Sequence, residues 1–235
     1  DTSSTDNYDT DPDSDTLTVT AIRTGSSENN GTPGSVGSAL DGTYGQLTIA
    51  ANGSYTYVAN KDAADALDPG DVVTDSFNYT VSDGQGETDI AVLTITVIGI
   101  NDAPVADNET NSVSHSQTLT VTDGTSDVLH GDTDADASAS LTVTGIRTGQ
   151  EGGSGTAGTV GTSLTGSYGT LTIAADGTYT YVANSSGGID YFTYTVSDGI
   201  GGTDTAQITI TVNAAPVAAD NTGIVNEDGT LTVAD

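Results

Sequence analysis

Two clusters of aspartates are the residues of this chain whose type and spacing could do chemistry. The segments "DTDPDSD" at 9–15 and "DTDADAS" at 132–138 place carboxylates at alternate positions. Alternate residues of an extended or looped segment can direct several oxygens at one ion, and Ca²⁺ prefers oxygen ligands. Like charges about 4 Å apart cost on the order of 1 kcal/mol per pair even in water, and a bound cation reverses that sign. The clusters therefore predict cation sites that contain Asp9, Asp11 and Asp13, and Asp132, Asp134 and Asp136.

Each cluster also has a simpler interpretation. Aspartate side chains often accept hydrogen bonds from backbone amides two residues further along the chain and so stabilise a turn without any metal. The spacing alone leaves both interpretations open.

The overall charge excludes several classes of partner. The chain has 33 acidic and 3 basic residues among 235, for a formal net charge of −30. Such a field repels nucleic acid and anionic membrane surfaces, so neither is an expected partner. Cysteine is absent, which excludes disulfides and thiolate zinc sites. The longest apolar stretch, at 90–100, is too short to span a bilayer, so no membrane insertion is expected.

An internal repeat determines the expected fold. Residues 17–60 match residues 141–184, and after a longer connection in the first copy "FNYTVSDG" at 77–84 matches "FTYTVSDG" at 192–199. Apolar residues alternate along both copies, as in β-strands with one buried face. The dipeptides Asn52-Gly53 and Asp176-Gly177 predict two-residue hairpin turns. The expected fold class is all-β, with tandem immunoglobulin-like β-sandwich domains.

The frame of the repeat predicts how the chain is divided. Residues 213–235 match residues 101–123, the opening segment of the second copy, and no such segment precedes the first copy. We therefore expect a sandwich at 1–100 without its own first strand, a complete sandwich at 101–212, and the first strand of a further repeat at 213–235. Three explanations fit: one period of a covalent array, subunits that polymerise by donating residues 213–235, or a boundary that falls inside a domain.

The order of motifs resembles a known family. "VSDG" followed by a strand, "GINDAPVA" at 99–106, "NEDGTLTV" at 226–233 and "DTDADAS" resemble the bacterial cadherin-like repeats, in particular the VCBS repeats of giant secreted surface proteins. The resemblance covers essentially the whole chain, twice. It implies cadherin-like sandwiches in an extended, calcium-stiffened array outside a bacterium, as in adhesins and biofilm or matrix proteins.

The family's joints combine acids near the end of a first strand, an Asn-Asp linker and an Asp-x-Asp loop. The resemblance therefore implies a Ca²⁺ joint with linker residues Asn101 and Asp102, a loop with Asp132 and Asp134, and the acids Glu227 and Asp228 donated from the preceding unit.

A second joint departs from this pattern. The first strand of the second copy has Ser114-His115-Ser116 where acids are expected, and Asn213 is followed by Ala214. Asp9 and Asp11 of the next unit would remain, so a weaker joint is expected there.

These observations predict a structural role. We expect a repeat unit of an extracellular bacterial fibre or adhesin stalk at the cell surface, joined end to end with copies of itself or with adjoining repeats, and not an enzyme. The alternative is a carbohydrate-binding, lectin-like module whose Gly-rich loops at 25–43 and 149–167 recognise surface glycans.

Overall fold

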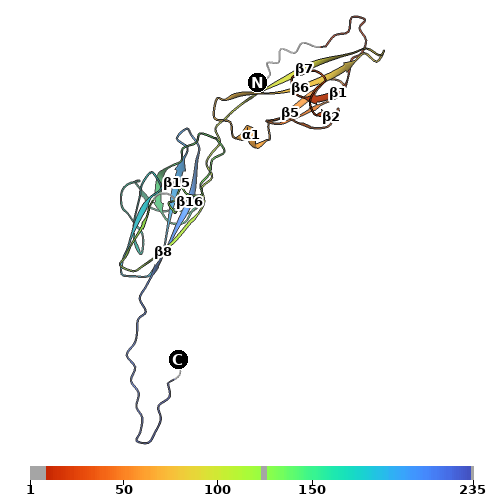
Figure 1. The fold of residues 1–235 in the computed structure, drawn as a ribbon. Helices are drawn as coiled ribbons and strands as arrows, with labels where there is room; N and C mark the ends of the chain where they lie inside the picture. The colour runs from red at the N-terminus through yellow and green to blue at the C-terminus, as the bar shows by residue number, and fades with distance from the viewer. Residues whose placement is uncertain (1–8, 123–125, 234–235) are drawn as a thin grey trace. The chain divides into compact units, whose positions relative to one another are not determined.

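The structure, a computed structural model, describes residues 9–122 and 126–233, and almost all of its regular structure is β (Figure 1). It divides into two units. The first contains residues up to 106 together with 131–142 and 196–204, and the second contains 107–130, 143–195 and 205 onward. Two loops that the repeat assigns to the second copy thus belong to the first unit. Among the described residues, no helix is long and apolar enough to cross a bilayer.

The first unit is a sandwich of two sheets. Its elements are β1 (Thr18–Thr24), β2 (Pro33–Gly34), β3 (Leu40–Asp41), β4 (Gln46–Ile49), β5 (Tyr55–Val58), α1 (Asp62–Asp65), β6 (Val72–Ser82) and β7 (Thr88–Ile98). One sheet has the order β2-β1-β6-β7 and the other β3-β4-β5. The core between them includes Ile22 of β1, Leu47 of β4 and Phe77 of β6.

The second unit repeats this sandwich with two more strands. Its elements are β8 (Glu109–Ser114), β9 (Thr118–Val121), β10 (Thr142–Thr148), β11 (Ala157–Gly158), β12 (Leu164–Thr165), β13 (Gly169–Ile173), β14 (Tyr179–Ala183), β15 (Gly188–Ser197) and β16 (Thr203–Asn213). One end of each of the strands β10, β15 and β16 belongs to the first unit. The sheets have the orders β11-β10-β15-β16-β8 and β12-β13-β14-β9. The predicted fold class, tandem β-sandwiches, is confirmed.

The two strands β8 and β9 have no counterpart among the described residues of the first unit. β8 runs parallel to β16, and β9 runs antiparallel to β14. In the first unit β7 is the counterpart of β16, and β5 is the counterpart of β14. Both are the outer strands of their sheets. Each sheet of the first unit therefore ends one strand earlier.

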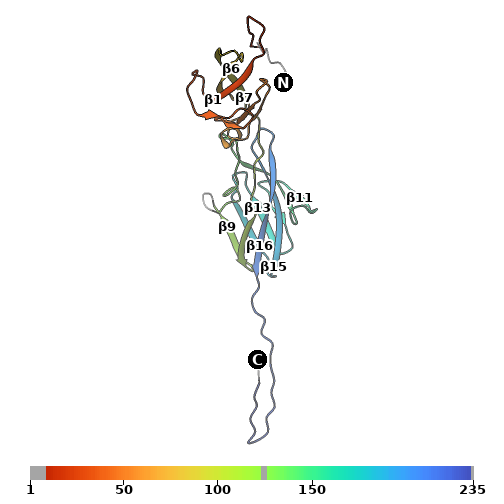
Figure 2. The ribbon, with the colours of Figure 1, turned by 90° about the vertical axis from the view of Figure 1, so that its right-hand side faces the viewer.

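The segment that follows β16 extends away from its sandwich. Residues 214–233 are exposed and form no strand, and the chain doubles back near residues 226–229 (Figure 2). Its apolar side chains include Val217, which is 95% exposed. The chain's own second unit therefore leaves this segment without a sheet to join.

One local prediction was wrong. The hairpin at Asn52-Gly53 has a three-residue loop, because the amide of Ala50 donates to the carbonyl of Ser54 at 2.8 Å. Only Gly53 has positive φ, at 84°, as in a type I turn followed by a left-handed residue. The hairpin at Asp176-Gly177 closes in the same way, with Ala174 donating to Thr178.

A buried carboxylate ties three elements together in each unit. Asp75 of β6, 4% exposed, accepts hydrogen bonds from the Tyr57 hydroxyl at 2.5 Å and from the amides of Thr43 and Tyr44. Burial alone would raise the pKa of Asp75, but the bonds from Tyr57, Tyr44 and Thr43 hold it below its ordinary value. A Cβ at Gly42 would lie 2.4 Å from the carboxylate, so only glycine fits there.

The second unit has the same arrangement. Asp190, 3% exposed, accepts from the Tyr181 hydroxyl at 2.6 Å and from the amides of Ser167 and Tyr168 at 2.7 and 3.0 Å. Neither aspartate was predicted from the sequence to have a role.

We predict that Tyr57→Phe lowers the free energy of unfolding of the first unit by about 1.5–3 kcal/mol, because a hydrogen bond to a buried carboxylate is lost. The ionised form of Asp75 is the one that these bonds stabilise. The variant should therefore lose the full amount of unfolding free energy above about pH 4, the ordinary pKa of aspartate. This difference from the unmodified chain should shrink as the pH falls through the lower pKa of Asp75 in the folded state. Urea unfolding of the full chain at pH 7 and near pH 2.5 measures this. Tyr55→Phe, at a residue 40% exposed, is the matched control, and an equal loss at both pH values would contradict the assignment.

Candidate metal site

The candidate site lies in the first unit, where three segments meet. They are the linker that follows β7 (99–106), the loop at 131–138, and the turn between β15 and β16 (198–202). Val105 and Thr133 form a bridge in which each amide donates to the other's carbonyl, at 2.7 and 3.0 Å. The linker and the Asp-rich loop are therefore held side by side by backbone bonds.

The side chains of the linker and the loop interlock. The amide of Asp102 donates to Asp136 Oδ2 at 2.9 Å, and the amide of Asp136 donates to Asp134 Oδ1 at 2.9 Å. Asn101 Nδ2 donates to Asp198 Oδ2 and to the Asp102 carbonyl, both at 2.8 Å. Four residues predicted as ligands, Asn101, Asp102, Asp134 and Asp136, are thus brought together.

Three buried oxygens at this place have no hydrogen-bond partner: Asn101 Oδ1, Asp134 Oδ2 and Asp136 Oδ1. Asp136 itself is only 4% exposed. A buried polar atom without a partner costs roughly 1–3 kcal/mol, and more when it carries charge, so such atoms usually have an unseen water or ion. The oxygens come from two carboxylates and one amide, which is a donor set suited to Ca²⁺.

The described residues contain no group of three or more Asp, Glu, His or Cys side chains in metal-binding geometry. This is compatible with the three unpartnered oxygens, because one of them belongs to an asparagine. The residues present therefore fit a Ca²⁺ ion that is completed by further oxygens.

Asp198 is a residue of this site that the sequence analysis missed. It is 6% exposed, holds Asn101 and accepts hydrogen bonds from the amides of Ile200, Gly201 and Gly202 at 2.8–3.0 Å. Burial would raise the pKa of Asp198, but these bonds, first that of Asn101, hold it below its ordinary value. The repeated "VSDG" motif was the available signal, because it places an aspartate at the same turn in both copies.

The first aspartate cluster is arranged differently. Asp11 Oδ1 accepts hydrogen bonds from the amides of Asp13 at 2.8 Å and Asp15 at 3.1 Å, as in the metal-free turn interpretation. Asp9 accepts from the Tyr79 hydroxyl at 3.0 and 3.3 Å. Asp9 and Asp13 are exposed, whereas Asp136 is buried. A cation at this cluster remains a prediction.

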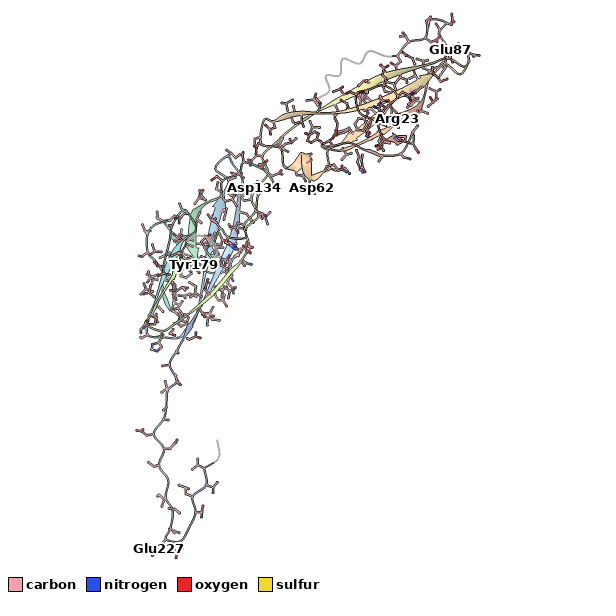
Figure 3. All side chains as sticks on the ribbon, viewed as in Figure 1. Arg23, Asp62, Glu87, Asp134, Tyr179 and Glu227 are labelled. Atoms are coloured by element: carbon pink, nitrogen blue, oxygen red, sulfur yellow. The ribbon has the colours of Figure 1, made fainter. Side chains whose placement is uncertain are left out.

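The remaining predicted ligands are Asp132, Glu227 and Asp228. Asp132 is half-buried at the start of the loop, two residues before Asp134. Glu227 and Asp228 are exposed at the turn of the segment after β16, where Figure 3 labels Glu227.

An insertion that only the first copy contains braces this site. Residues 61–71 include α1, and within them Leu67 is 8% exposed. The amide of Gly70 donates to the Gly99 carbonyl at 3.1 Å, and the amide of Gly99 donates back to the Asp71 carbonyl at 2.9 Å. A Cβ at Gly99 would lie 2.2 Å from the Asp68 carbonyl, so the linker passes too close for any other residue.

The same insertion also holds the loop. Asp68 Oδ1 accepts a hydrogen bond from the amide of Ser138 at 2.8 Å. Asp65 of α1, together with Asp102, Thr133 and Asp134, lines an open recess of about 400 Å³. Figure 3 labels Asp134 of the loop and Asp62 of α1. The insertion thus contacts the linker on one side and the Asp-rich loop on the other, which preorganises both.

We predict that Asp68→Ala speeds amide hydrogen exchange of Ser138 about tenfold or more in metal-free protein, because a charge-assisted hydrogen bond is lost. Asp68→Asn, which keeps an acceptor oxygen, should restore most of the protection. Asp62→Ala removes the same charge from α1 and is the control. Equal exchange in the Asp68→Ala and Asp62→Ala chains would show that the insertion does not hold the loop.

Comparisons with known proteins agree with this architecture. The model of the bacterial cadherin-like domain family matches residues 1–99 and 101–214. The calcium-binding lectin RapA2 of Rhizobium johnstonii is 25% identical over 182 residues, which are 74% of this chain and 73% of that protein.

Solved cadherin structures are among those that align. Repeats EC22–24 of mouse cadherin-23 are 14% identical with a TM-score of 0.40, over 87% of this chain and 57% of that one. Repeats EC1–2 of human mucin-like protocadherin are 14% identical with a TM-score of 0.36, over 83% and 84%. The family match, which covers both copies, carries the conclusion: this chain belongs to the bacterial cadherin-like domain family.

Proposed function

We propose that this chain is a non-catalytic structural repeat of an extracellular bacterial adhesin or fibre, and that Ca²⁺ stiffens the joint formed by Asn101, Asp102, Asp134 and Asp136. The single observation that carries the calcium assignment is the set of three buried oxygens without partners. The family match and the name of the calcium-binding relative support it. The net charge of −30 adds to the electrostatic gain from a bound cation.

The ion's main effect would be rigidity. Extracellular modules bind Ca²⁺ with dissociation constants of about 10⁻⁴–10⁻³ M. At a tenfold excess over such a constant, one ion stabilises the folded state by only about 1.4 kcal/mol. An ion held by Asn101 of the linker and by Asp134 and Asp136 of the loop would, however, add a cross-link to the hydrogen bonds that already join these two segments. Stiffness of the joint is therefore the larger benefit.

The partners in this proposal are copies of the chain or adjoining repeats, joined end to end through residues 213–235. Among its described residues, the first unit lacks the two strands that β8 and β9 add to the second unit. The segment after β16 is exposed and carries the sequence of that missing pair. Together with the family, these features support a filament or stalk at the bacterial surface, as in a biofilm matrix.

We predict that replacing Asp134 and Asp136 by Asn raises the dissociation constant for Ca²⁺ more than about tenfold, because both carboxylates are removed from the site. Isothermal titration calorimetry of the full chain measures this. In the unmodified chain, calcium should also raise the melting temperature and narrow the distribution of interatomic distances in small-angle scattering.

The matched control makes the same two changes at Asp11 and Asp13, the counterparts in the first cluster. These changes should leave the strongest binding event intact. If the unmodified chain takes up no calcium at millimolar concentration, or if both double variants bind alike, the proposed site is wrong.

A second candidate is carbohydrate binding, which the name of the lectin relative favours. The Gly-rich loop at 25–43 is anchored by Asn78, whose Nδ2 donates to the carbonyls of Thr24, Gly25 and Asn30 at 3.0–3.3 Å. Arg147 holds the equivalent loop through the carbonyls of Thr148 and Gln150. Such fixed loops could present polar groups to a glycan. Glycan-array binding that is lost when the loop at 25–43 is shortened would favour this function.

A further inference from the structure

We propose that the two open sheet edges of the first unit accept residues 221–233 of a second copy of this chain. These residues enter as two strands joined by a turn, and one strand adds to each sheet. The inference rests on the proposed end-to-end association and specifies the contacts that carry it. It differs from the addition of a single strand, because one segment closes both sheets together.

The acceptor consists of β7 and β5, whose outer edges face no strand of the described chain. At the same positions of the second unit, β16 pairs with β8 and β14 pairs with β9. An open edge presents unpaired N–H and C=O groups that favour pairing with another chain.

An inner-face side chain beside the open edge of β5 is exposed. Tyr55 of β5 is 40% exposed, whereas its counterpart Tyr179 of β14 is 2% exposed. Val58 and Val182, on the opposite face of the same strands, are 55% and 53% exposed. Tyr55 therefore differs from Tyr179 on the inner face, next to the position that β9 occupies in the second unit, whereas these two valines do not differ.

The other sheet shows the same contrast. Leu93 and Ile95 of β7 are half-buried. Their counterparts Ile208 and Ile210 of β16, beside β8, are fully buried at 0% exposure. An apolar strip thus runs along both open edges.

The donor segment, residues 221–233, already has a turn like the one that joins β8 to β9. Asp228 has φ 68°, and Ser116, at the same position between β8 and β9, has φ 57°. Non-glycine residues rarely adopt positive φ. The amide of Gly229 donates to the Asn226 carbonyl at 2.9 Å, as that of Gln117 donates to Ser114 at 3.2 Å. The donor is therefore bent for two-sheet insertion while still exposed.

The second unit supplies the register. Val113 lies opposite Val212, Val121 opposite Tyr179, and Leu119 opposite Tyr181. Transferred to the first unit through the repeat, this places the donated residues in three pairs: Val225 with Val97, Val233 with Tyr55, and Leu231 with Tyr57.

Val225 and Val233 of the donor segment are exposed in the free chain, and this register would bury them. Val225 and Val233 are 53% and 78% exposed, whereas their counterparts Val113 and Val121 are 9% and 5% exposed. Ile224 corresponds to Ser112, which is exposed, so its side chain would point to solvent. Neighbouring residues of the donor are thus predicted to lie on opposite faces.

The register also places the donated turn beside the metal-site linker. In the second unit the amide of His115 donates to the Asn213 carbonyl at 2.9 Å. The equivalent bond would join the amide of the donated Glu227 to the carbonyl of Ile98, three residues before Asn101. Docking would therefore bring Glu227 and Asp228 to the side of the sandwich from which the linker leaves.

The test compares two adjacent substitutions in the full chain. Val225→Glu places a carboxylate where an apolar core is expected, and should weaken self-association about a hundredfold or more. Ile224→Glu adds the same charge on the opposite face and should leave it within a few-fold of the unmodified chain. Sedimentation velocity across a concentration series measures both. Because residues 224 and 225 lie outside every strand, neither change threatens folding of the chain's own units.

The register is tested by cross-linking, since the chain contains no cysteine of its own. A Val58→Cys chain mixed with a Thr230→Cys chain should form an intermolecular disulfide rapidly, because these residues would be directly opposite each other. A Thr232→Cys chain, two residues out of register, should react much more slowly with the same partner.

Four results are decisive. Loss of association in Val225→Glu alone, with preferential cross-linking at Thr230, supports the proposal. Equal association of both glutamate variants, or faster cross-linking at Thr232, overturns it. A full chain that stays monomeric at every concentration also overturns it. If the valine effect and the register hold while the chain binds no calcium, only the metal assignment fails.

Discussion

The sandwich of the second unit is closed by two consecutive strands, because β8 and β9 add one strand to each of its sheets. A strand at the edge of a sheet presents a row of main-chain N–H and C=O groups without protein partners, and a further strand pairs with them. Among the described residues, the first unit has the corresponding sheets without these two strands, and Tyr55 of β5 is 40% exposed whereas its counterpart Tyr179 is 2% exposed. The proposed docking of a second copy would supply the same closure to the first unit.

The candidate metal site depends on the same principle of satisfying buried groups. Backbone bonds between Val105 and Thr133, and between Asp102 and Asp136, hold the linker against the loop. That packing buries three carboxylate and amide oxygens for which the described residues provide no hydrogen-bond donor. The insertion at 61–71 adds bonds to both segments but none to these oxygens. The proposed Ca²⁺ ion would supply the partner that these oxygens lack.

The sequence alone predicted the repeat, the all-β class and two of the three segments that meet at the site, the linker and the Asp-rich loop. Alternation of apolar residues carries that information because each strand buries one face. It could not predict the register shift between Val19 and Ala21, which buries Val19 and Ile22 although they are three residues apart. The bonds that cause such a shift join residues distant in the sequence.

Three further features were beyond sequence reasoning for similar reasons. Asp75 and Asp190 look like exposed strand residues until their tyrosine partners are placed. The turn at Asn52-Gly53 was located correctly, but its length depends on which amide closes it. The role of Asp198 depends on a linker almost a hundred residues earlier in the chain.

The parallel pairing of β8 with β16 has a mechanical consequence. The chain enters the second unit at the start of β8 and leaves it at the end of β16, and the two strands run side by side from Ile208 opposite Glu109 to Asn213 opposite Ser114. Tension applied through the chain would therefore pull these strands in opposite directions along their length. The bonds between them would be loaded together in shear and could not be peeled apart one after another, so this pairing would act as a clamp against forced extension.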